Sequence, residues 1–252
     1  MQFVVKRDVL LKSLNFVQGV VEKKNTLPIL SNVLLQLKDK KLYIIATDLD
    51  IVFYDEISDV KITTEGSTTT SASVLYDILR KISSNADLIF DLKSEKRLSL
   101  KSVNSDFNLL CLPIDNFPTF SDEFESEVVN LDKHRFLKLL NKTKISISND
   151  DTRHYLNGVF LHVTEANGRN FLTGVATDSH RLSSSSLEIN TMNNFSSLIL
   201  PRKAVFQMCT LLSETSEKLE MQASENKIKF SLGKITLISK VIDGKFPDYK
   251  KV

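Results

Sequence analysis

The chain has 252 residues, with 33 lysines and arginines against 31 aspartates and glutamates and a net charge of +2. This length is enough for one large domain or two ordinary ones, each with a buried core. The near balance of charge excludes the whole-protein basicity of tight DNA-binding proteins, so any contact with nucleic acid depends on locally placed charge. Cys111 and Cys209 are isolated in sequence, which argues against a disulfide framework or a zinc site. We therefore expect a cytoplasmic protein without metal or cofactor.

The first half of the chain opens with a strand predicted over residues 2–6. Because Lys6 and Arg7 follow directly, we expect neither a signal peptide nor a membrane anchor here. A helix comes next, with Asp8 as its expected N-cap. Its apolar residues recur at helical spacing, at Leu10, Leu11, Leu14 and Val17.

The rest of the first half alternates between apolar and polar residues. This pattern predicts half-buried strands over residues 33–37 and 41–47, joined by a turn at Asp39-Lys40. A second helix is predicted over residues 73–82. Closing strands are expected over residues 87–92, 97–102 and 107–113.

The second half repeats this order of elements. A strand over residues 126–131 leads to a helix with Asp132 as its N-cap and with Phe136, Leu139 and Leu140 on its apolar side. The strands that follow, 159–163 and 171–177, flank a turn at Asn167-Gly168. A second helix is predicted over residues 202–212, and closing strands over 218–223, 227–232 and 235–242.

Four short markers recur in one order at a nearly constant offset, which indicates a duplicated domain. They are Leu30–Leu35 with Leu156–Leu161, Ala46-Thr47-Asp48 with Ala176-Thr177-Asp178, Val74-Leu75-Tyr76 with Ala204-Val205-Phe206, and Phe117-Pro118-Thr119-Phe120 with Phe246-Pro247-Asp248-Tyr249. We expect one domain over residues 1–120, an acidic linker over 121–127 and a second domain over 128–252. Each is predicted to be an α+β unit in which two helices cover one face of an antiparallel sheet of about eight strands.

The duplicated unit carries the strings TLPILSNVLLQ, DDTRHYLNG, ATDSHRL and DGKFPDYKKV. With these strings the whole chain resembles the bacterial DNA sliding clamp, the β subunit of DNA polymerase III. The resemblance implies the DNA-clamp fold, with three such domains per subunit and two subunits closing head to tail into a ring. We expect these 252 residues to be the first two domains, with the third domain absent from this chain and a homodimer ring formed only at full length.

The resemblance also implies a function: a processivity factor of DNA replication and DNA repair, not an enzyme. The expected partners are double-stranded DNA, held without sequence preference, and proteins that dock through short peptide motifs. These proteins are the catalytic subunit of DNA polymerase III, the clamp loader and repair polymerases. No membrane contact is expected.

A clamp must slide, so its grip on DNA has to come from weak attraction between cations and phosphates. In the helix predicted after Asp132, Arg135, Lys138 and Lys142 lie on the stripe opposite the apolar side. Such a stripe is also typical of a merely solvated helix face, and the resemblance favours DNA.

The resemblance implies DNA-contact positions at Lys24, Ser73, Asp150, His154 and Tyr155, and it favours a DNA contact for Lys138 and Lys142 on the stripe. Further candidates on the basic side are Arg153, Arg202 and Lys203. Three of the implied positions depart from the family pattern. Ser73 carries no charge, Asp150 replaces an amide and would repel phosphate, and His154 replaces one aromatic ring.

The second site that the resemblance implies is a peptide-binding pocket. Its positions are Leu156, Thr177, Ser179, His180, Arg181, Leu182, Pro247, Lys251 and Val252. The apolar members are suited to peptide Leu and Phe side chains, and His180 and Arg181 to a polar rim. Taken without the family, the apolar members are core residues and Asp178 with His180 forms a satisfied turn.

A third surface, the dimer interface, is implied at Ile78, Phe107 and Leu109, which ordinary core packing would also explain.

Two other functions remain as alternatives. A hydrolase built on Asp178 and His180 lacks further ligands, because the sequence has no HxH, HExxH, GxSxG or glycine-rich phosphate loop. A β-rich scaffold without a DNA role would fit the element pattern. Retention on circular DNA, lost on linearisation, separates a ring from both.

Overall fold

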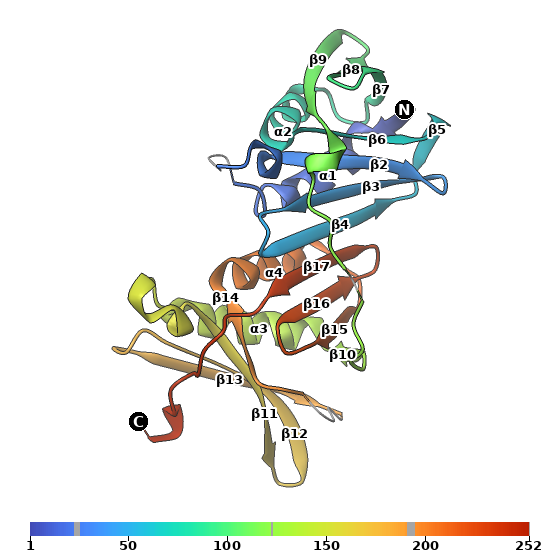
Figure 1. Ribbon diagram of the computed structural model, residues 1–252. Helices are drawn as coiled ribbons and strands as arrows, with labels where there is room; N and C mark the ends of the chain where they lie inside the picture. The colour runs from blue at the N-terminus through green and yellow to red at the C-terminus, as the bar shows by residue number, and fades with distance from the viewer. Residues whose placement is uncertain (23–25, 122, 191–194, 252) are drawn as a thin grey trace. The chain divides into compact units, whose positions relative to one another are not determined.

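The computed structural model describes residues 1–22, 26–121, 123–190 and 195–251 (Figure 1). The chain divides into two compact units. The first is Met1–Ser121 with Lys234–Thr236, and the second is Asp122–Gly233 with Leu237–Val252. The residues of the expected linker that the structure describes lie outside helices and strands.

The first unit holds an antiparallel sheet in the order β4-β3-β2-β6-β9-β8-β7-β1-β5. Its strands are β1 (Gln2–Lys6), β2 (Asn32–Lys38), β3 (Lys41–Thr47), β4 (Ile51–Ile57), β5 (Val60–Thr64), β6 (Gly66–Ser71), β7 (Asp87–Ser94), β8 (Arg97–Ser102) and β9 (Ser105–Leu112). The helices α1 (Arg7–Val17) and α2 (Ala72–Lys81) pack against each other and against this sheet. Short 3-10 helices are η1 (Pro28–Ser31) and η2 (Ile114–Asn116).

The expected apolar stripe forms the core of the first unit. Leu10, Leu14 and Val17 of α1 are fully buried. The Phe3 and Phe90 rings stack at 4.7 Å between the paired strands β1 and β7, which adds a favourable ring geometry to the buried area.

The prediction that Asp8 caps α1 is wrong. The strand β1 runs directly into the helix, which begins at Arg7 and has Lys6 as its N-cap residue. The Asp8 carboxylate instead accepts the backbone N–H of Asn85 at 2.7 Å and pairs with Arg7 at 2.6 Å. A neighbouring loop therefore uses the acceptor that an isolated helix would have used itself.

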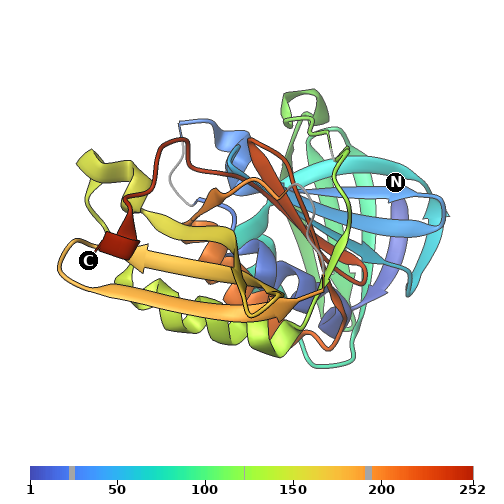
Figure 2. The same ribbon diagram turned by 90° about the horizontal axis from the view of Figure 1, so that it is seen from below.

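The second unit holds two antiparallel sheets, in the orders β10-β15-β16-β17 and β13-β12-β11-β14. The strands are β10 (Val129–Leu131), β11 (Gly158–Ala166), β12 (Arg169–Thr177), β13 (Leu182–Ile189), β14 (Leu198–Pro201), β15 (Leu219–Ala223), β16 (Lys227–Leu232) and β17 (Ile235–Lys240). The helices α3 (Lys133–Thr143) and α4 (Arg202–Glu214) pack side by side (Figures 1 and 2). Three 3-10 helices complete the unit, η3 (Lys144–Ser146), η4 (Asp151–Leu156) and η5 (Tyr249–Lys251).

Helix α3 lies against β12 and β13 (Figure 2). Gly174 in β12 permits the close approach, because a Cβ there would lie 2.5 Å from Leu139 Cδ2. Both predicted hairpin turns are confirmed by left-handed backbone: φ is 53° and 60° at Asp39 and Lys40, and 53° and 71° at Asn167 and Gly168.

Two predicted strands of the second unit are shorter than expected by two residues or more. β10 begins at Val129 and not at residue 126. β17 ends at Lys240, and Ile242 instead forms an isolated bridge to Ile199, its N–H donating to the Ile199 carbonyl at 2.9 Å. This bridge joins the chain after β17 to the edge strand β14, ahead of the C-terminal segment that carries Pro247.

Candidate functional site

The helix pair of the second unit concentrates positive charge. Residues 133–146 and 202–213 together contain seven lysines and arginines and no aspartate or glutamate. On α3, Phe136, Leu139 and Leu140 are buried, whereas the predicted basic stripe at Arg135, Lys138 and Lys142 is exposed. A chain with a net charge of only +2 thus carries one strongly cationic surface.

The start of α3 is fixed as predicted. The Asp132 side chain accepts the backbone N–H of Arg135 at 2.9 Å, which confirms the N-cap. Lys133 donates to the backbone carbonyl of Thr215, just beyond α4, so this lysine joins the two helices. The cations available to a ligand are the ones farther along the helix.

Asp150 has a different environment from the one that the sequence suggested. Its carboxylate accepts the hydroxyl of Thr152 at 2.6 Å and the N–H of Thr152 at 2.9 Å, and it pairs with Arg153 Nε at 2.8 Å. The hydroxyl of Thr152 is the largest of the causes that lower the pKa of Asp150 to about 2. Because Arg153 neutralises this charge, we expect less repulsion of phosphate than from a free carboxylate.

Arg153 also links the two predicted sites. Its Nη1 donates to the hydroxyl of Ser179 at 2.7 Å. Arg153 is a predicted DNA contact and Ser179 a predicted peptide-pocket residue, so this hydrogen bond connects the two sites. Ser179 has a left-handed φ of 77°. The neighbouring His154 and Tyr155 rings meet edge to face at 5.9 Å, with His154 exposed and Tyr155 half-buried.

The other predicted DNA positions are dispersed. Ser73 lies in the first turn of α2, in the first unit, with its hydroxyl 3.3 Å from that of Ser71. Arg202 is exposed and Lys203 half-buried at the start of α4. Lys24 lies outside the described residues.

The predicted peptide-pocket residues belong to a turn and a buried cluster. Thr177, Ser179, His180, Arg181 and Leu182 lie in or beside the turn between β12 and β13, where Leu182 is 40% exposed. Leu156 is only 2% exposed. It belongs to an apolar cluster with Val175, Ile199 and Phe246.

Asp178 organises this turn. Its carboxylate accepts the backbone N–H groups of His180 and Arg181, each at 3.0 Å, and pairs with Arg181 Nε at 2.9 Å. The backbone hydrogen bonds are the main reason why the pKa of Asp178 is lowered. The residue types alone, without the family resemblance, predict such a turn with its hydrogen bonds satisfied. The carboxylate is used for the backbone, which leaves no poised acid–base pair for hydrolysis.

The C-terminal segment packs on β11. Phe246 stacks on Phe160 with centroids 4.9 Å apart, and Tyr249 Oη lies 2.9 Å from His162 Nε2. Pro247 is exposed between these two anchors. Lys251 is exposed and pairs with Asp248 at 3.2 Å, and Val252 lies outside the described residues.

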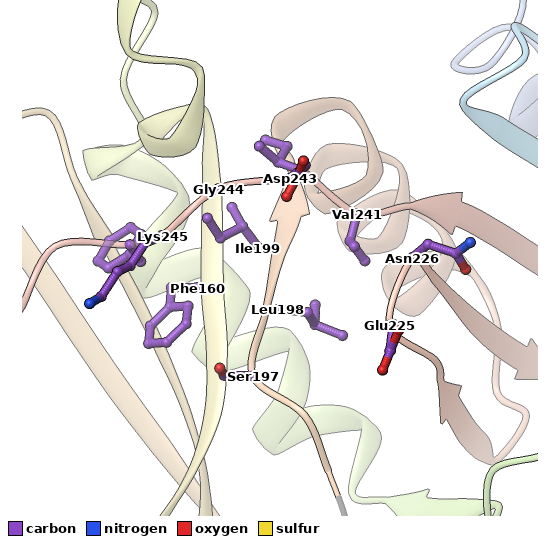
Figure 3. A pocket seen from close by; sticks show the side chains of 12 residues that line it. Phe160, Ser197, Leu198, Ile199, Glu225, Asn226, Val241, Asp243, Gly244 and Lys245 are labelled. Atoms are coloured by element: carbon purple, nitrogen blue, oxygen red, sulfur yellow. The ribbon is translucent and has the colours of Figure 1, made fainter.

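A cavity of about 740 Å³ is lined in part by Ile199 and Phe246, which also belong to the apolar cluster of Leu156. Figure 3 shows Ile199 with other residues of the lining. Its lining combines apolar side chains with charged ones, among them Phe160, Leu198, Ile199, Glu225, Asp243 and Lys245. It contains none of the nine predicted pocket positions. Its walls come from four separate segments, so no local sequence pattern could have indicated it.

The predicted dimer contacts differ in accessibility. Leu109 is 4% exposed and faces the core, whereas Phe107 and Ile78 are half-buried. Leu110, on the opposite face of β9, is 77% exposed.

Among the described residues, no group of three potential metal ligands occurs. Over the same residues, no helix is long and apolar enough to span a membrane.

Two family models match the chain. Residues 1–121 match the N-terminal domain of the DNA polymerase III beta subunit, and residues 130–248 match its central domain. The chain is 38% identical to the beta sliding clamp of Caulobacter vibrioides over 254 residues, covering 100% of this chain and 68% of the relative. It is 36% identical to the beta sliding clamp of Escherichia coli K12 over 253 residues, with the same coverages of 100% and 68%.

Solved structures agree. The beta sliding clamp of Caulobacter crescentus superimposes with a TM-score of 0.95 at 38% identity, covering 100% of this chain and 67% of that one. The sliding clamp of Bartonella birtlesii bound to griselimycin gives a TM-score of 0.94 at 37% identity, covering 100% and 68%. The chain therefore belongs to the β sliding clamp family of DNA polymerase III, whose members are processivity factors of replication and not catalytic enzymes.

Proposed function

We propose that this chain encircles double-stranded DNA as part of a head-to-tail homodimer ring and docks polymerases through a peptide pocket. The cationic surface of α3 and α4 is the observation that carries the DNA half of this proposal. Its seven basic residues, with no carboxylate among them, attract the phosphates of DNA whatever the base sequence. Sliding requires contacts of this kind, because contacts to base edges would hold the protein at particular sequences.

The DNA contact is assigned to the exposed cations Lys138, Lys142 and Arg202, with Lys203 beside them. His154 and Tyr155 contribute rings, and Arg153 contributes a partly neutralised charge. Lys24, Ser73 and Asp150 remain proposed contacts, of which Ser73 is supported least because its hydroxyl already meets Ser71. The ring itself is proposed to close over Phe107 and Ile78, with Leu109 supporting them from the core.

The peptide pocket is assigned to the turn after β12 and to Pro247. Leu182 and Pro247 present exposed apolar atoms, and His180 and Arg181 form a polar rim. Leu156 supports the floor from the buried cluster. The clients we propose are the polymerase III catalytic subunit, the clamp loader and repair polymerases, acting in the cytoplasm. Short peptides that place Leu and Phe side chains in such a groove bind with a Kd on the order of micromolar.

Binding of duplex DNA as a function of salt tests the proposal. We expect Kd to weaken linearly with salt on logarithmic axes, and Lys138→Gln with Lys142→Gln to reduce the slope by about 0.9 for each phosphate that is no longer neutralised. Lys218→Gln is the matched control, because Lys218 is exposed in the same unit but precedes β15 and lies outside both helices. Equal slopes for the parent, the double variant and the control would contradict the proposal.

A further inference from the structure

One aromatic ring on the cationic surface is exposed and lies beside two cations. Phe206 of α4 is 41% exposed. The Arg202 guanidinium carbon lies 5.0 Å from its ring centroid, and Lys144 Nζ lies 5.5 Å from the same centroid. Arg202 is one helical turn before Phe206, whereas Lys144 comes from η3 after α3. The ring thus collects charge from two segments far apart in the sequence.

These two cations keep their charge available. Neither Arg202 nor Lys144 pairs with a carboxylate in the described part of the chain, and both neighbouring helices lack acidic residues until Glu214. Arg153, by contrast, directs its guanidinium to Asp150 and Ser179. A π face attracts a cation without neutralising it, so a phosphate can still bind.

We infer that Phe206 is a positioning residue that holds Arg202 and Lys144 ready for the backbone phosphates of duplex DNA. This inference rests on the proposed DNA-binding function and extends it to Lys144, which no sequence pattern singled out. Ordering a long side chain before binding removes an entropy cost that is otherwise incurred on the DNA. The phenyl ring supplies that order, and the cations supply the contact.

A purely structural role makes a different prediction. If the ring only stabilises the packing of α4 on η3, Phe206→Leu lowers the melting temperature and leaves the salt dependence and affinity for DNA unchanged. If it positions the cations, Phe206→Leu weakens DNA binding by about two- to tenfold, and Phe206→Tyr, which keeps a π face, restores it.

The test uses the full chain and duplex DNA in salt titrations with five variants. They are Lys138→Gln, Lys144→Gln, Phe206→Leu, Phe206→Tyr and the control Lys218→Gln. We expect Lys144→Gln to reduce the salt slope by about 0.9, Phe206→Leu to weaken binding, and Phe206→Tyr and Lys218→Gln to match the parent. Melting curves accompany each variant, and Lys144→Gln keeps the test decisive if Phe206→Leu does not fold.

The outcomes separate this inference from the function on which it rests. If Lys138→Gln reduces the slope while Lys144→Gln and Phe206→Leu behave like Lys218→Gln, the positioning role is wrong and the proposed DNA function stands. If Phe206→Tyr is as weak as Phe206→Leu, the π face is not what holds the cations. Parent binding without any salt dependence overturns the proposed function and this inference together.

Discussion

Replacement of Gly244 by alanine is the most direct test of how the candidate sites are supported. Gly244 has a φ of 142°, a region that side-chain-bearing residues rarely adopt, and a Cβ there would lie 3.1 Å from Tyr155 Cβ. The strained backbone alone costs about 1–3 kcal/mol. The short contact also pushes the segment before Phe246 away from Tyr155, which displaces both a proposed DNA contact and the wall of the peptide pocket.

The matched control is Gly168→Ala. Gly168 also has a positive φ, 71°, but a Cβ there would meet nothing within 4 Å. Its cost is the left-handed strain alone, about 1–2 kcal/mol. We expect denaturant unfolding to give a larger loss of stability for Gly244→Ala than for Gly168→Ala, and only Gly244→Ala to weaken peptide and DNA binding. Equal losses with unchanged binding would refute the claim that the close approach of Gly244 to Tyr155 supports the sites.

Four side chains in or beside the candidate sites give further expected outcomes. Burial lowers the pKa of His162 below its ordinary 6.5. The unfolded chain therefore binds a proton at a higher pH than the folded chain does, and the melting temperature should fall as the pH drops from about 6.5 toward the lowered pKa. This fall should be smaller in His162→Gln. Asp150→Asn removes a charge that stays ionised down to pH about 2, and salt titration should show tighter DNA binding; unchanged affinity would mean that the Asp150 carboxylate is too remote from phosphate. Ser179→Gly relieves a left-handed φ of 77° but removes the Arg153 hydrogen bond, so peptide affinity should fall while stability is kept or rises, as measured by anisotropy and melting. Leu182→Asp should abolish binding of a Gln-Leu…Leu-Phe peptide, and parent-like binding would mean that the pocket lies elsewhere.

The elements that depend on local chemistry could be predicted from the sequence. The stripe of Phe136, Leu139 and Leu140 follows from helical periodicity, and the Asp132 cap and the turn at Asp39-Lys40 follow from residues suited to those positions. Each depends on contacts within a few residues. The duplication also helped, because each half predicts the same order of helices and strands as the other.

Features that depend on distant contacts could not be predicted. β13 has the sequence LSSSSLEI, which lacks the apolar alternation of a strand. It pairs with β12 along the backbone, and side-chain hydroxyls such as Thr173 Oγ1 and Ser186 Oγ, 2.8 Å apart, add contacts between the two strands. Asp8 is of a residue type that suits an N-cap, yet its carboxylate binds Asn85, far along the chain. Phe206 belongs to an apolar-periodic segment, yet its ring is 41% exposed and lies beside Arg202 and Lys144.

The same contrast supports the proposed DNA contact of this nearly neutral chain. Two carboxylates that accept backbone N–H groups are each paired with an arginine: Asp150 with Arg153, and Asp178 with Arg181. Residues 133–146 and 202–213, by contrast, hold seven cations and no carboxylate of their own. Each exposed cation adds only a small, salt-sensitive attraction. In the ring that we propose, many weak contacts of this kind would keep the protein near the phosphates without stopping it at any sequence, whereas a few tight contacts to base edges would stop it.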